Sequence, residues 1–263
     1  MTSNAGRIPT SKWTKHNLLR KNERLVPHLP DTNPYTSATA AAYLQNFGCV
    51  IIKPEWSEGG HRVCRICRKP HGYTIEQGET RIHVDHFRQI EQTLPPWIAR
   101  KPCLVQRYIH LARLNGRPVD IRTIIQRRPD GRFEVSGTFC KIAPAARFVT
   151  NVKQGGVALP LHRYLSEIMP EKSAREQVRR ELYQVSEHIG ETLGGQFRNS
   201  VYGIDLGLDE QQKIWVIEVN TQPNLNILQK IDPVMHRRAK WLQRYQRAQS
   251  HGRRTYPAAR RSN

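Results

Sequence analysis

Hydrophobic and polar positions along the chain fall into two kinds of pattern, the three-to-four-residue spacing of amphipathic helices and the short apolar runs of strands. The longest helical pattern covers 171–193, where apolar residues recur three or four apart on one face. Shorter helices are predicted over 11–20, where Ser11 is a suitable cap, and over 36–47. A proline-rich connector over 27–34 separates these two helices.

Strands are predicted where apolar residues run together between turn signals. These runs lie at 49–52, 104–109, 119–127, 132–142, 202–208 and 213–220. Short alternating segments over 62–84 predict hairpins, and Asp85 is expected to cap a helix that ends near Leu94. A basic helix is expected after the last strand. Helices and mostly antiparallel strands in this order predict an α+β fold with a sheet on each side of a cleft.

Composition changes this picture mainly through charge. The 263 residues include 42 Lys and Arg against 22 Asp and Glu, a formal net charge of +20. This excess favours acidic partners, among them nucleotide phosphates, polyphosphates, nucleic acid and anionic polymers, without choosing between them. Trp and Tyr are scattered, which argues against a base-stacking platform, so nucleic acid is not expected to be the specific partner.

Apolar windows and cysteines bear on the compartment. The sequence has neither an apolar window of about 18 residues nor a secretory leader, which predicts a soluble cytoplasmic protein without a membrane partner. The five cysteines are odd in number and thinly spread, which argues against a disulfide framework and predicts mostly small core residues. Cys64, Cys67 and His71 resemble half of a zinc site, but no second ligand pair follows and we expect packing in a hairpin.

The last predicted pair of strands carries the strongest chemical signal. Glu218 and Asn220 share a strand face, because side chains alternate along a strand. If 209–212 form the loop of a hairpin, Asp205 lies opposite Val216 and has Glu218 as a diagonal neighbour about 7 Å away. Carboxylate and carbonyl oxygens are the ligands that Mg²⁺ prefers. A magnesium site is therefore predicted, and the alternative is an exposed edge hairpin with solvated polar residues.

Lys53 is a candidate phosphate ligand. It ends a strand just before the small-residue loop Ser57-Glu58-Gly59-Gly60, where a point charge and closely approaching backbone amides suit an anion. The alternative is a surface lysine before a tight turn.

Two groups in the middle of the chain could also hold an anion. Asp120 and Arg122 share a strand face, and Arg122 could bind a phosphate or carboxylate through two nitrogens, with a surface ion pair as the alternative. A second group lies close to the glycine pair at 155–156 and consists of Lys141, Arg147 and Asn151. A solvated basic face is the alternative there.

Taken in order, these segments resemble the motifs of a known superfamily. They are Ser11–Lys15, Val50–Pro54, Val105–Ile109, Asp120–Arg122, Val149–Val152 with Gly155 and Gly156, and Ile217–Pro223. The series is similar to that of the ATP-grasp superfamily, and its order and spacing most resemble the YheC/YheD family of endospore coat-associated proteins, with RimK-type glutamate ligases as more distant relatives. The resemblance covers residues 11–230.

The resemblance implies an ATP-grasp fold, in which two α+β lobes with antiparallel sheets grip ATP between them. It divides the chain into an N-terminal helix and connector with the first ATP lysine (1–34), a small lobe ending in the hinge strand (35–108), a large lobe with the Mg²⁺ site (109–232), and a basic C-terminal helix and tail (233–263).

Roles for individual residues follow from the same resemblance. The implied ATP contacts are Lys12 and Lys53 on the phosphates, the loop residues Ser57, Gly59 and Gly60 above them, and the hinge residues Gln106, Arg107, Tyr108 and Ile109 facing adenine. The implied catalytic residues are Arg122, Lys141 and Asn151, and the implied ligands of Mg²⁺ or Mn²⁺ are Asp205, Glu218 and Asn220. Lys15 lies as near to the expected first lysine position as Lys12, so the choice between them stays open.

The implied activity is ATP-dependent joining of a carboxylate to an amine through an acyl phosphate. The partners are then ATP, an unidentified carboxylate and an unidentified amine, and a spore coat or an anionic polymer is a further expected partner. Gln106 stands where several ligases have Glu, and Glu58 puts an acid in the phosphate loop, which both bear on turnover. The alternatives are a cationic coat or polyanion-binding protein with a vestigial ATP site, and an ATP-grasp phosphotransferase.

Overall fold

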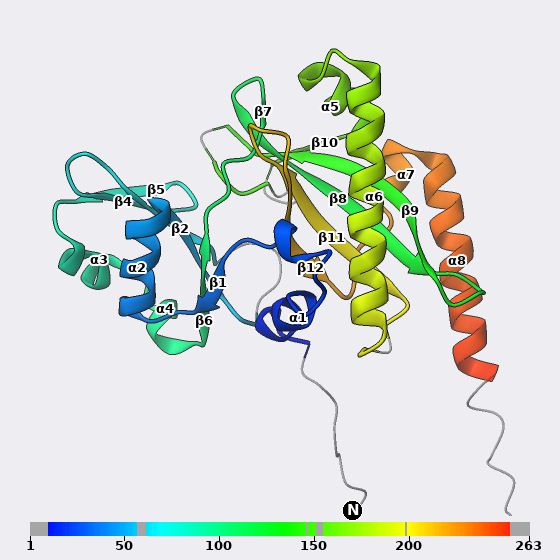
Figure 1. Cartoon of the computed structure of the whole chain (residues 1–263), viewed down its shortest axis with the longest axis horizontal. Helices are drawn as coiled ribbons and strands as arrows, with labels where there is room; N and C mark the ends of the chain where they lie inside the picture. Colours follow the sequence, from blue (N-terminus) through cyan, green and yellow to red (C-terminus); the bar gives the residue numbers. More distant parts are fainter. Residues whose placement is uncertain (1–9, 57–61, 146, 151–154, 198, 253–263) are drawn as a thin grey trace, which may run out of the picture.

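The computed structural model describes residues 10–56, 62–145, 147–150, 155–197 and 199–252. These residues form two lobes side by side, each built on an antiparallel sheet, and the chain crosses between them after β6 (Figure 1). The α+β class and the pair of antiparallel sheets confirm the predicted fold.

The small lobe has a sheet whose strands follow the order β1-β6-β2-β3-β4-β5. Its elements are β1 (Thr32–Pro34), α2 (Ser37–Phe47), β2 (Cys49–Pro54), β3 (Cys64–Arg68), β4 (Tyr73–Gln77), β5 (Thr80–Val84), α3 (Phe87–Thr93), α4 (Trp97–Arg100) and β6 (Cys103–Arg107). The three helices and one face of the sheet enclose a core that includes Leu44, Ile52, Ile66, Ile75 and Ile90. The predicted hairpins over 62–84 are β3, β4 and β5. The connector expected over 27–34 contains strand β1.

The end of α2 fixes the start of β2. Thr36 caps the helix by accepting a hydrogen bond from the backbone N–H of Thr39, whose side chain accepts one from the backbone of Thr36 in return. Gly48 ends the helix at a φ of 71°, a left-handed conformation that glycine adopts without strain. The strand that ends beside Lys53 therefore starts immediately after this turn.

The cap of α3 differs from the prediction. The helix begins at Phe87 with His86 as its N-cap, so Asp85 is not the cap. The side chain of Gln89 accepts hydrogen bonds from the backbone N–H groups of Asp85 and His86. Gln89, in the first turn, thus bonds back to N–H groups that precede the helix, as the third helical residue of a capping box does, and it does not replace the aspartate as the cap.

The large lobe has a sheet in the order β10-β9-β8-β11-β12, with β7 paired to β8. Its elements are β7 (Arg113–Leu114), β8 (Arg117–Arg127), β9 (Phe133–Ile142), β10 (Val157–Leu159), α5 (Leu161–Ile168), α6 (Lys172–Gly194), β11 (Val201–Leu208), β12 (Ile214–Asn220), α7 (Leu228–Ile231) and α8 (Pro233–Gly252). The predicted long helix is α6, and the predicted strands of this lobe are β8, β9, β11 and β12.

Helices cover the two faces of the large sheet unequally. The apolar side of α6, with α5, packs on one face and buries residues such as Ile121, Leu182, Ile189 and Ile204. On the opposite face, α7 and α8 cover only the part around Ile124 and Phe139. No helix in the described ranges is long and apolar enough to cross a membrane.

The remainder of that second face carries polar side chains and turns toward the small lobe. The N-terminal helix α1 (Lys12–Leu19) lies between the lobes beside β12, and the single turn η1 (Val26–His28) leads from it to β1 (Figure 1). Both lobes and α1 therefore contribute to the space between the sheets.

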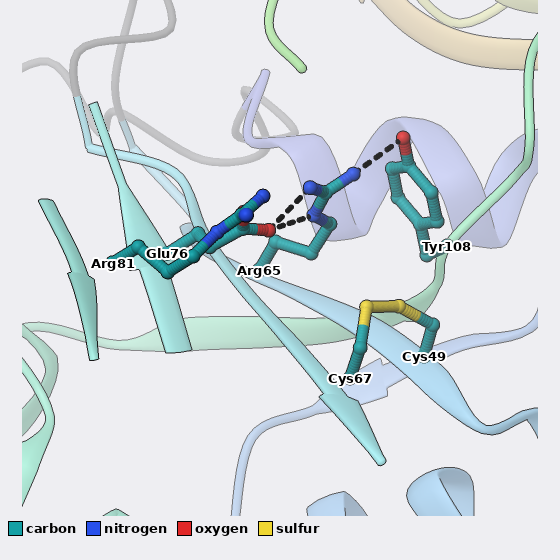
Figure 2. The surroundings of a disulfide bond; sticks show 6 residues. All are labelled: Cys49, Arg65, Cys67, Glu76, Arg81 and Tyr108. Atoms are coloured by element: carbon teal, nitrogen blue, oxygen red, sulfur yellow. Dashed lines mark hydrogen bonds and ion pairs between the residues drawn. A yellow bond between two sulfur atoms is a disulfide. The ribbon is translucent and has the colours of Figure 1, made fainter. Parts of the chain in front are cut away.

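The cysteines correct one expectation. Cys49 and Cys67 lie opposite each other in β2 and β3 and form a disulfide (Figure 2), because the antiparallel register brings their Cα atoms to 4.1 Å. Cys64 points to the opposite side of β3 and is buried in the small-lobe core, as its strand position predicts. Cys103 and Cys140 are also buried and free. Three of the five thus serve as core residues, while spacing along the chain could not show that two others meet across strands.

Candidate functional site

A bulge in the β11–β12 hairpin brings two carboxylates directly opposite each other. Asp205 pairs with Glu218, while the next residue, Leu206, pairs with Val216, so Ile217 is an extra residue without a partner in β11. The prediction that Asp205 faces Val216 is therefore wrong by two positions, one from the bulge and one from the turn, where Leu208 pairs with Ile214 instead of Lys213. Asn220 lies on the same side and donates a hydrogen bond to Asp205 Oδ2 at 3.3 Å. The three predicted metal ligands do lie together.

Asp205 is held by two cations of the large lobe. Arg122 binds it through two nitrogens, Nε to Oδ1 at 2.6 Å and Nη2 to Oδ2 at 2.8 Å, and Lys141 Nζ lies 2.8 Å from Oδ1. Burial alone would raise the pKa of the Asp205 carboxyl, but Arg122 and Lys141 hold the pKa well below its usual range. The predicted catalytic pair thus forms a buried cluster with a predicted metal ligand. The surface ion pair considered for Arg122 is excluded, because its partner is Asp205 and both are largely buried.

Glycine permits the close approach of Arg122. A Cβ at Gly203, the neighbour of Asn220 in the hairpin, would lie 3.2 Å from the Arg122 guanidinium and 2.7 Å from Pro223. The Arg122 side chain therefore passes over the backbone of Gly203, where no Cβ blocks it, and reaches Asp205.

Asp120 is the second carboxyl of the large-lobe cluster. Its Oδ2 lies 3.0 Å from Lys141 Nζ and accepts a hydrogen bond from the Thr150 hydroxyl. Its Oδ1 is buried and has no hydrogen-bond partner among the described residues. Burial, reinforced by the charge of Asp205, raises the pKa of Asp120 to about 7 against the opposing effect of Lys141. The cluster therefore contains one carboxylate fixed in the ionised form and one carboxyl that titrates near neutral pH.

Lys53 reaches this region from the small lobe. Its Nζ donates to Gln106 Oε1 at 2.8 Å and to the carbonyl of Ile217, the bulge residue, at 3.3 Å. Gln106 in turn donates to Thr32 Oγ1 at 2.8 Å, which directs its amide oxygen toward Lys53. Burial, helped by the charges of Lys12 and Lys15, lowers the pKa of Lys53 to about 8. Lys53 is therefore a buried cation between the lobes and not a surface lysine.

Helix α1 supplies two more lysines. Ser11 caps the helix by accepting from the backbone N–H of Thr14, which fixes the first turn. Lys12 Nζ lies 3.4 Å from Glu218 Oε1, and Lys15 Nζ donates to the carbonyl of Val219. Both side chains thus reach β12, and the structure keeps both as candidates for the first ATP lysine.

A small cavity of about 40 Å³ lies between these groups. Its lining comes from α1, both lobes and β1, and includes Lys12, Lys15, Thr32, Lys53, Gln106 and Glu218. His16 also lines it, and burial together with Lys53 lowers the pKa of this histidine to about 4, so it is neutral near pH 7. The sequence analysis missed Thr32 and His16, because no local pattern distinguishes them from other residues of a connector and a helix.

The predicted hinge residues have separate environments. Gln106 faces Lys53 as described, and Arg107 lies over the rings of Phe47 and Trp215, 5.2 Å from each centroid. Tyr108 accepts a hydrogen bond from Arg65 Nη1 at 2.9 Å, and Ile109 is buried. The segment therefore contacts both lobes where the chain passes between them.

Arg65 links the hinge to a buried acid that sequence reasoning missed. It lies between Tyr108 and Glu76, and Arg81 holds Glu76 from the other side (Figure 2). Burial alone would raise the pKa of Glu76, but hydrogen bonds from both arginines keep it below its usual range. The register of β3 on β4 pairs Arg65 with Glu76. A cross-strand charge pair of this kind becomes visible only when the register is known.

A larger cavity of about 520 Å³ lies at one end of the small-lobe sheet. It is lined by the β4–β5 hairpin, by Pro95 and Pro96, and by residues 147–149. Arg147, which the sequence grouped with Lys141, lies here and forms an ion pair with Glu79. Arg147 thus contacts the small lobe while Lys141 belongs to the Asp205 cluster.

Some predicted site residues lie outside the described ranges, namely Ser57, Gly59, Gly60 and Asn151. Within the described ranges no three His, Cys, Asp or Glu side chains form a group that could hold a metal. The oxygens at hand are those of two carboxylates, Asp205 and Glu218, and the Asn220 amide. This donor set fits Mg²⁺, which takes few protein ligands when phosphate and water supply the others.

Comparison with known proteins adds a family. Residues 4–248 match the model of a family described as YheC/D like ATP-grasp. Two proteins of Bacillus subtilis (strain 168) are similar: the endospore coat-associated protein YheD is 24% identical over 242 residues, and the endospore coat-associated protein YheC is 20% identical over 234 residues. Each alignment covers 87% of this chain, but only 52% of YheD and 64% of YheC. The chain therefore spans about half the length of one curated relative and less than two thirds of the other.

One solved structure of low sequence identity shares the fold. The C-terminal domain of K. lactis Pby1, an ATP-grasp enzyme interacting with the mRNA decapping enzyme Dcp2, has a TM-score of 0.50 at 16% identity, covering 88% of this chain and 69% of that chain. N5-carboxyaminoimidazole ribonucleotide synthetase from Thermotoga maritima has a TM-score of 0.45 at 13% identity, covering 81% and 42%. With the family match over 4–248 and the two-lobed architecture, the chain belongs to the YheC/D-like ATP-grasp family.

Proposed function

We propose that this protein binds Mg-ATP between its lobes and uses it to activate a carboxylate for joining to an amine. One observation carries the proposal: lysines from the small lobe and α1 meet two carboxylates and an amide of the β11–β12 hairpin at one place. Such a set offers cations for phosphate oxygens and oxygens for a divalent cation.

Phosphate binding falls to Lys53 and to Lys12 or Lys15. Lys53 is fixed by Gln106 and by the Ile217 carbonyl, so its ammonium group is already positioned. Its lowered pKa reflects burial near other cations, an environment in which a phosphate oxygen would favour the charged form. Ser57, Gly59 and Gly60 are proposed to close over the phosphates, and residues 106–109 to face adenine.

Asp205, Glu218 and Asn220 are proposed to hold Mg²⁺, which when bound neutralises phosphate charge and orients the phosphoryl group. Arg122 and Lys141 are proposed to orient the oxygens of the transferred group, because both are buried and aimed at Asp205. Asn151 is proposed to act beside them. The reaction would transfer the γ-phosphoryl group to a carboxylate oxygen, after which an amine would displace phosphate.

The names of two relatives support a proposal for where the protein acts. YheD and YheC carry the name endospore coat-associated. We extend that association to this chain as part of the proposal, with a carboxylate or amine on a coat component among the substrates.

Thermal unfolding with and without Mg-ATP tests the binding step. A ligand bound only by the native state at about 100 times its dissociation constant adds about 2.7 kcal/mol, which corresponds to a rise of about 5–10 °C in a domain of this size. Glu210→Gln is the matched control for the Glu218→Gln variant and should keep the full rise, because Glu210 is an exposed acid in the turn of the β11–β12 hairpin. No rise for the wild-type protein, at any Mg²⁺ concentration, would refute the nucleotide site.

A screen for ADP and phosphate release tests the chemistry. Amino acids, peptides and polyamines are tried in pairs of a carboxylate with an amine. Phosphate release that requires both compounds supports a ligase. ADP formation that requires only one of them, with the phosphoryl group found on it, would replace the ligase with a phosphotransferase.

A further inference from the structure

Helix α8 presents a basic and aromatic outer face that the ATP site does not use. The helix stands at the edge of the large lobe, on the side away from the small lobe (Figure 1). From Pro233 to the end of the chain the sequence has nine Lys or Arg residues and no acidic one. The charge excess of the protein is therefore concentrated in this region.

The inner side of α8 is fixed to the sheet. Ala239 and Leu242 are buried, and the first packs with Ile124 and Phe139. Polar contacts add to this anchoring: Gln126 donates to the carbonyl of Ala239, and Gln246 donates to the carbonyls of Arg127 and Ser200. The apolar side of the helix is therefore buried against the large lobe.

Five of the exposed residues follow one line along the helix. They are Val234, Arg237, Trp241, Arg244 and Ala248, three or four positions apart, which we call the α8 stripe; Arg238 and Arg247 are exposed beside it. Trp241 is 57% exposed, although tryptophan is usually well buried. Its ring stacks on Tyr245, with centroids 6.0 Å apart and planes 20° apart. Arg237 and Arg244 flank it, one turn before and one turn after.

Acidic side chains barely offset this charge. Glu134 holds Arg238, a neighbour of the stripe, at 2.9 Å. Asp232 precedes the helix and accepts from the backbone N–H groups of Val234 and Met235, so it serves as a cap. Neither acid forms an ion pair with Arg237 or Arg244 within the described ranges.

We propose that the α8 stripe binds single-stranded nucleic acid, with backbone phosphates on Arg237 and Arg244 and a base stacked on Trp241. Seven residues of helix separate the two arginines by about 10 Å, which leaves room for a base between their phosphate contacts. Base stacking on an exposed aromatic ring tolerates any sequence, and flanking arginines supply the attraction for phosphate. The scattered aromatics of the sequence gave no such platform, but the helix brings Trp241 and Tyr245 together.

The structure favours this polyanion over two others. A membrane-surface helix needs a free apolar face, and the apolar face of α8 is buried against β8 and β9. An acidic protein would pair with the arginines but has no special use for an exposed tryptophan. The inference does not depend on the ATP site, because α8 covers the other end of the sheet face.

Fluorescence anisotropy with a labelled oligo(dT) of about 20 nucleotides tests the proposal on the full chain. Trp241→Ala should weaken binding about 10-fold through loss of stacking, and Trp241→Phe should restore part of it. The double variant Arg237→Ala/Arg244→Ala should lower the dependence of log K on log salt by about 1.4, because each phosphate contact on a single strand contributes about 0.7. Arg163→Ala/Arg180→Ala is the control, since both residues are exposed on α5 and α6 and the charge removed is the same.

Three results would overturn the proposal. One is an absence of oligonucleotide binding by the wild-type protein at about 50 mM salt. Another is an equal loss of binding in the two double-arginine variants, which would mean attraction by net charge alone. A third is unchanged oligonucleotide binding by Trp241→Ala. If that variant also loses binding to phosphatidylglycerol vesicles, the stripe binds a membrane surface and not nucleic acid. Circular dichroism melting of each variant ensures that the comparison is between folded proteins.

Discussion

Glu218→Gln separates a metal ligand from a structural acid. The side chain of Glu218 is 26% exposed, and it forms an ion pair with Lys12 Nζ at 3.4 Å. Glutamine keeps the shape and one oxygen but removes the charge. On the proposed function the folded protein persists, while Mg²⁺-dependent ATP binding is weakened and turnover is lost.

The expected stability change is small because the pair is only partly buried. A pair of this kind contributes about 1 kcal/mol or less to the free energy of unfolding. Asp205→Asn makes the useful contrast, since Asp205 is buried and holds both Arg122 and Lys141. Its loss leaves two buried cations with one carboxyl, Asp120, and should cost about 3–5 kcal/mol.

Urea unfolding measures the free energy of unfolding, and titration of ATP at several Mg²⁺ concentrations measures the affinity for Mg-ATP. Glu218→Gln should change the free energy of unfolding by no more than about 1 kcal/mol. It should weaken binding of Mg-ATP by about 10-fold or more, because one of two carboxylate ligands has lost its charge. A Glu218→Gln protein that is several kcal/mol less stable, or that binds and turns over Mg-ATP normally, would refute the assigned role of this residue.

Three further predictions concern single features. Lys53→Met should weaken ATP binding and leave the fold intact. Burial lowers the pKa of Lys53 from 10.5 in the unfolded chain to about 8 in the folded protein, so between these values the unfolded chain binds more protons. The stability of the wild-type protein relative to Lys53→Met, measured by urea unfolding, should therefore rise with pH from about 8 to 10.5. A difference that falls with pH would contradict this. Truncation after Ser250 should leave the ATP affinity within a few-fold of the wild-type value, since the removed tail is rich in Gly, Pro and Arg and has no apolar periodicity. Loss of ATP binding in calorimetry would contradict this. Thiol titration in denaturant should find three free thiols without reductant and five with it, and five in both cases would contradict the Cys49–Cys67 disulfide.

The elements of the fold could be predicted because their causes are local. The apolar spacing of α6 and the runs of β8, β9, β11 and β12 are visible in the sequence, and the structure gives nearly the same bounds. The cap of α3 was misplaced because the helix starts one residue later than expected: His86 is the N-cap, and Gln89 bonds back to the N–H groups of Asp85 and His86.

The geometry of the site needed information that no local pattern contains. Alternation along a strand grouped Glu218 with Asn220 correctly, but the predicted pairing assumed a four-residue loop and a regular ladder. Leu208 pairs with Ile214 instead of Lys213, which moves the register by one residue, and the extra residue Ile217 moves it by one more, so Asp205 faces Glu218 and not Val216. The motif order drew attention to Lys53 and Gln106, which the structure places in contact, yet Thr32, which orients the Gln106 amide, joins them only through the pairing of β1 with β6.

The bulge at Ile217 connects these observations. It places Glu218 opposite Asp205, and the carbonyl of the bulged residue accepts a hydrogen bond from Lys53 of the other lobe. In the structure the carboxylates and cations of the site pair with each other, Asp205 with Arg122 and Lys141, and Glu218 with Lys12. Mg-ATP carries both signs of charge, so on the proposed function the carboxylates can turn to the metal and the cations to the phosphates without any buried charge losing its partner. Binding would then exchange internal ion pairs for ion pairs with the ligand. Because the bulge contacts Lys53 and also positions Glu218, the exchange would involve side chains of both lobes. This explains why we expect neutralising one carboxylate to affect Mg²⁺-dependent binding far more than an equal loss of charge on the exposed Glu210 of the same hairpin.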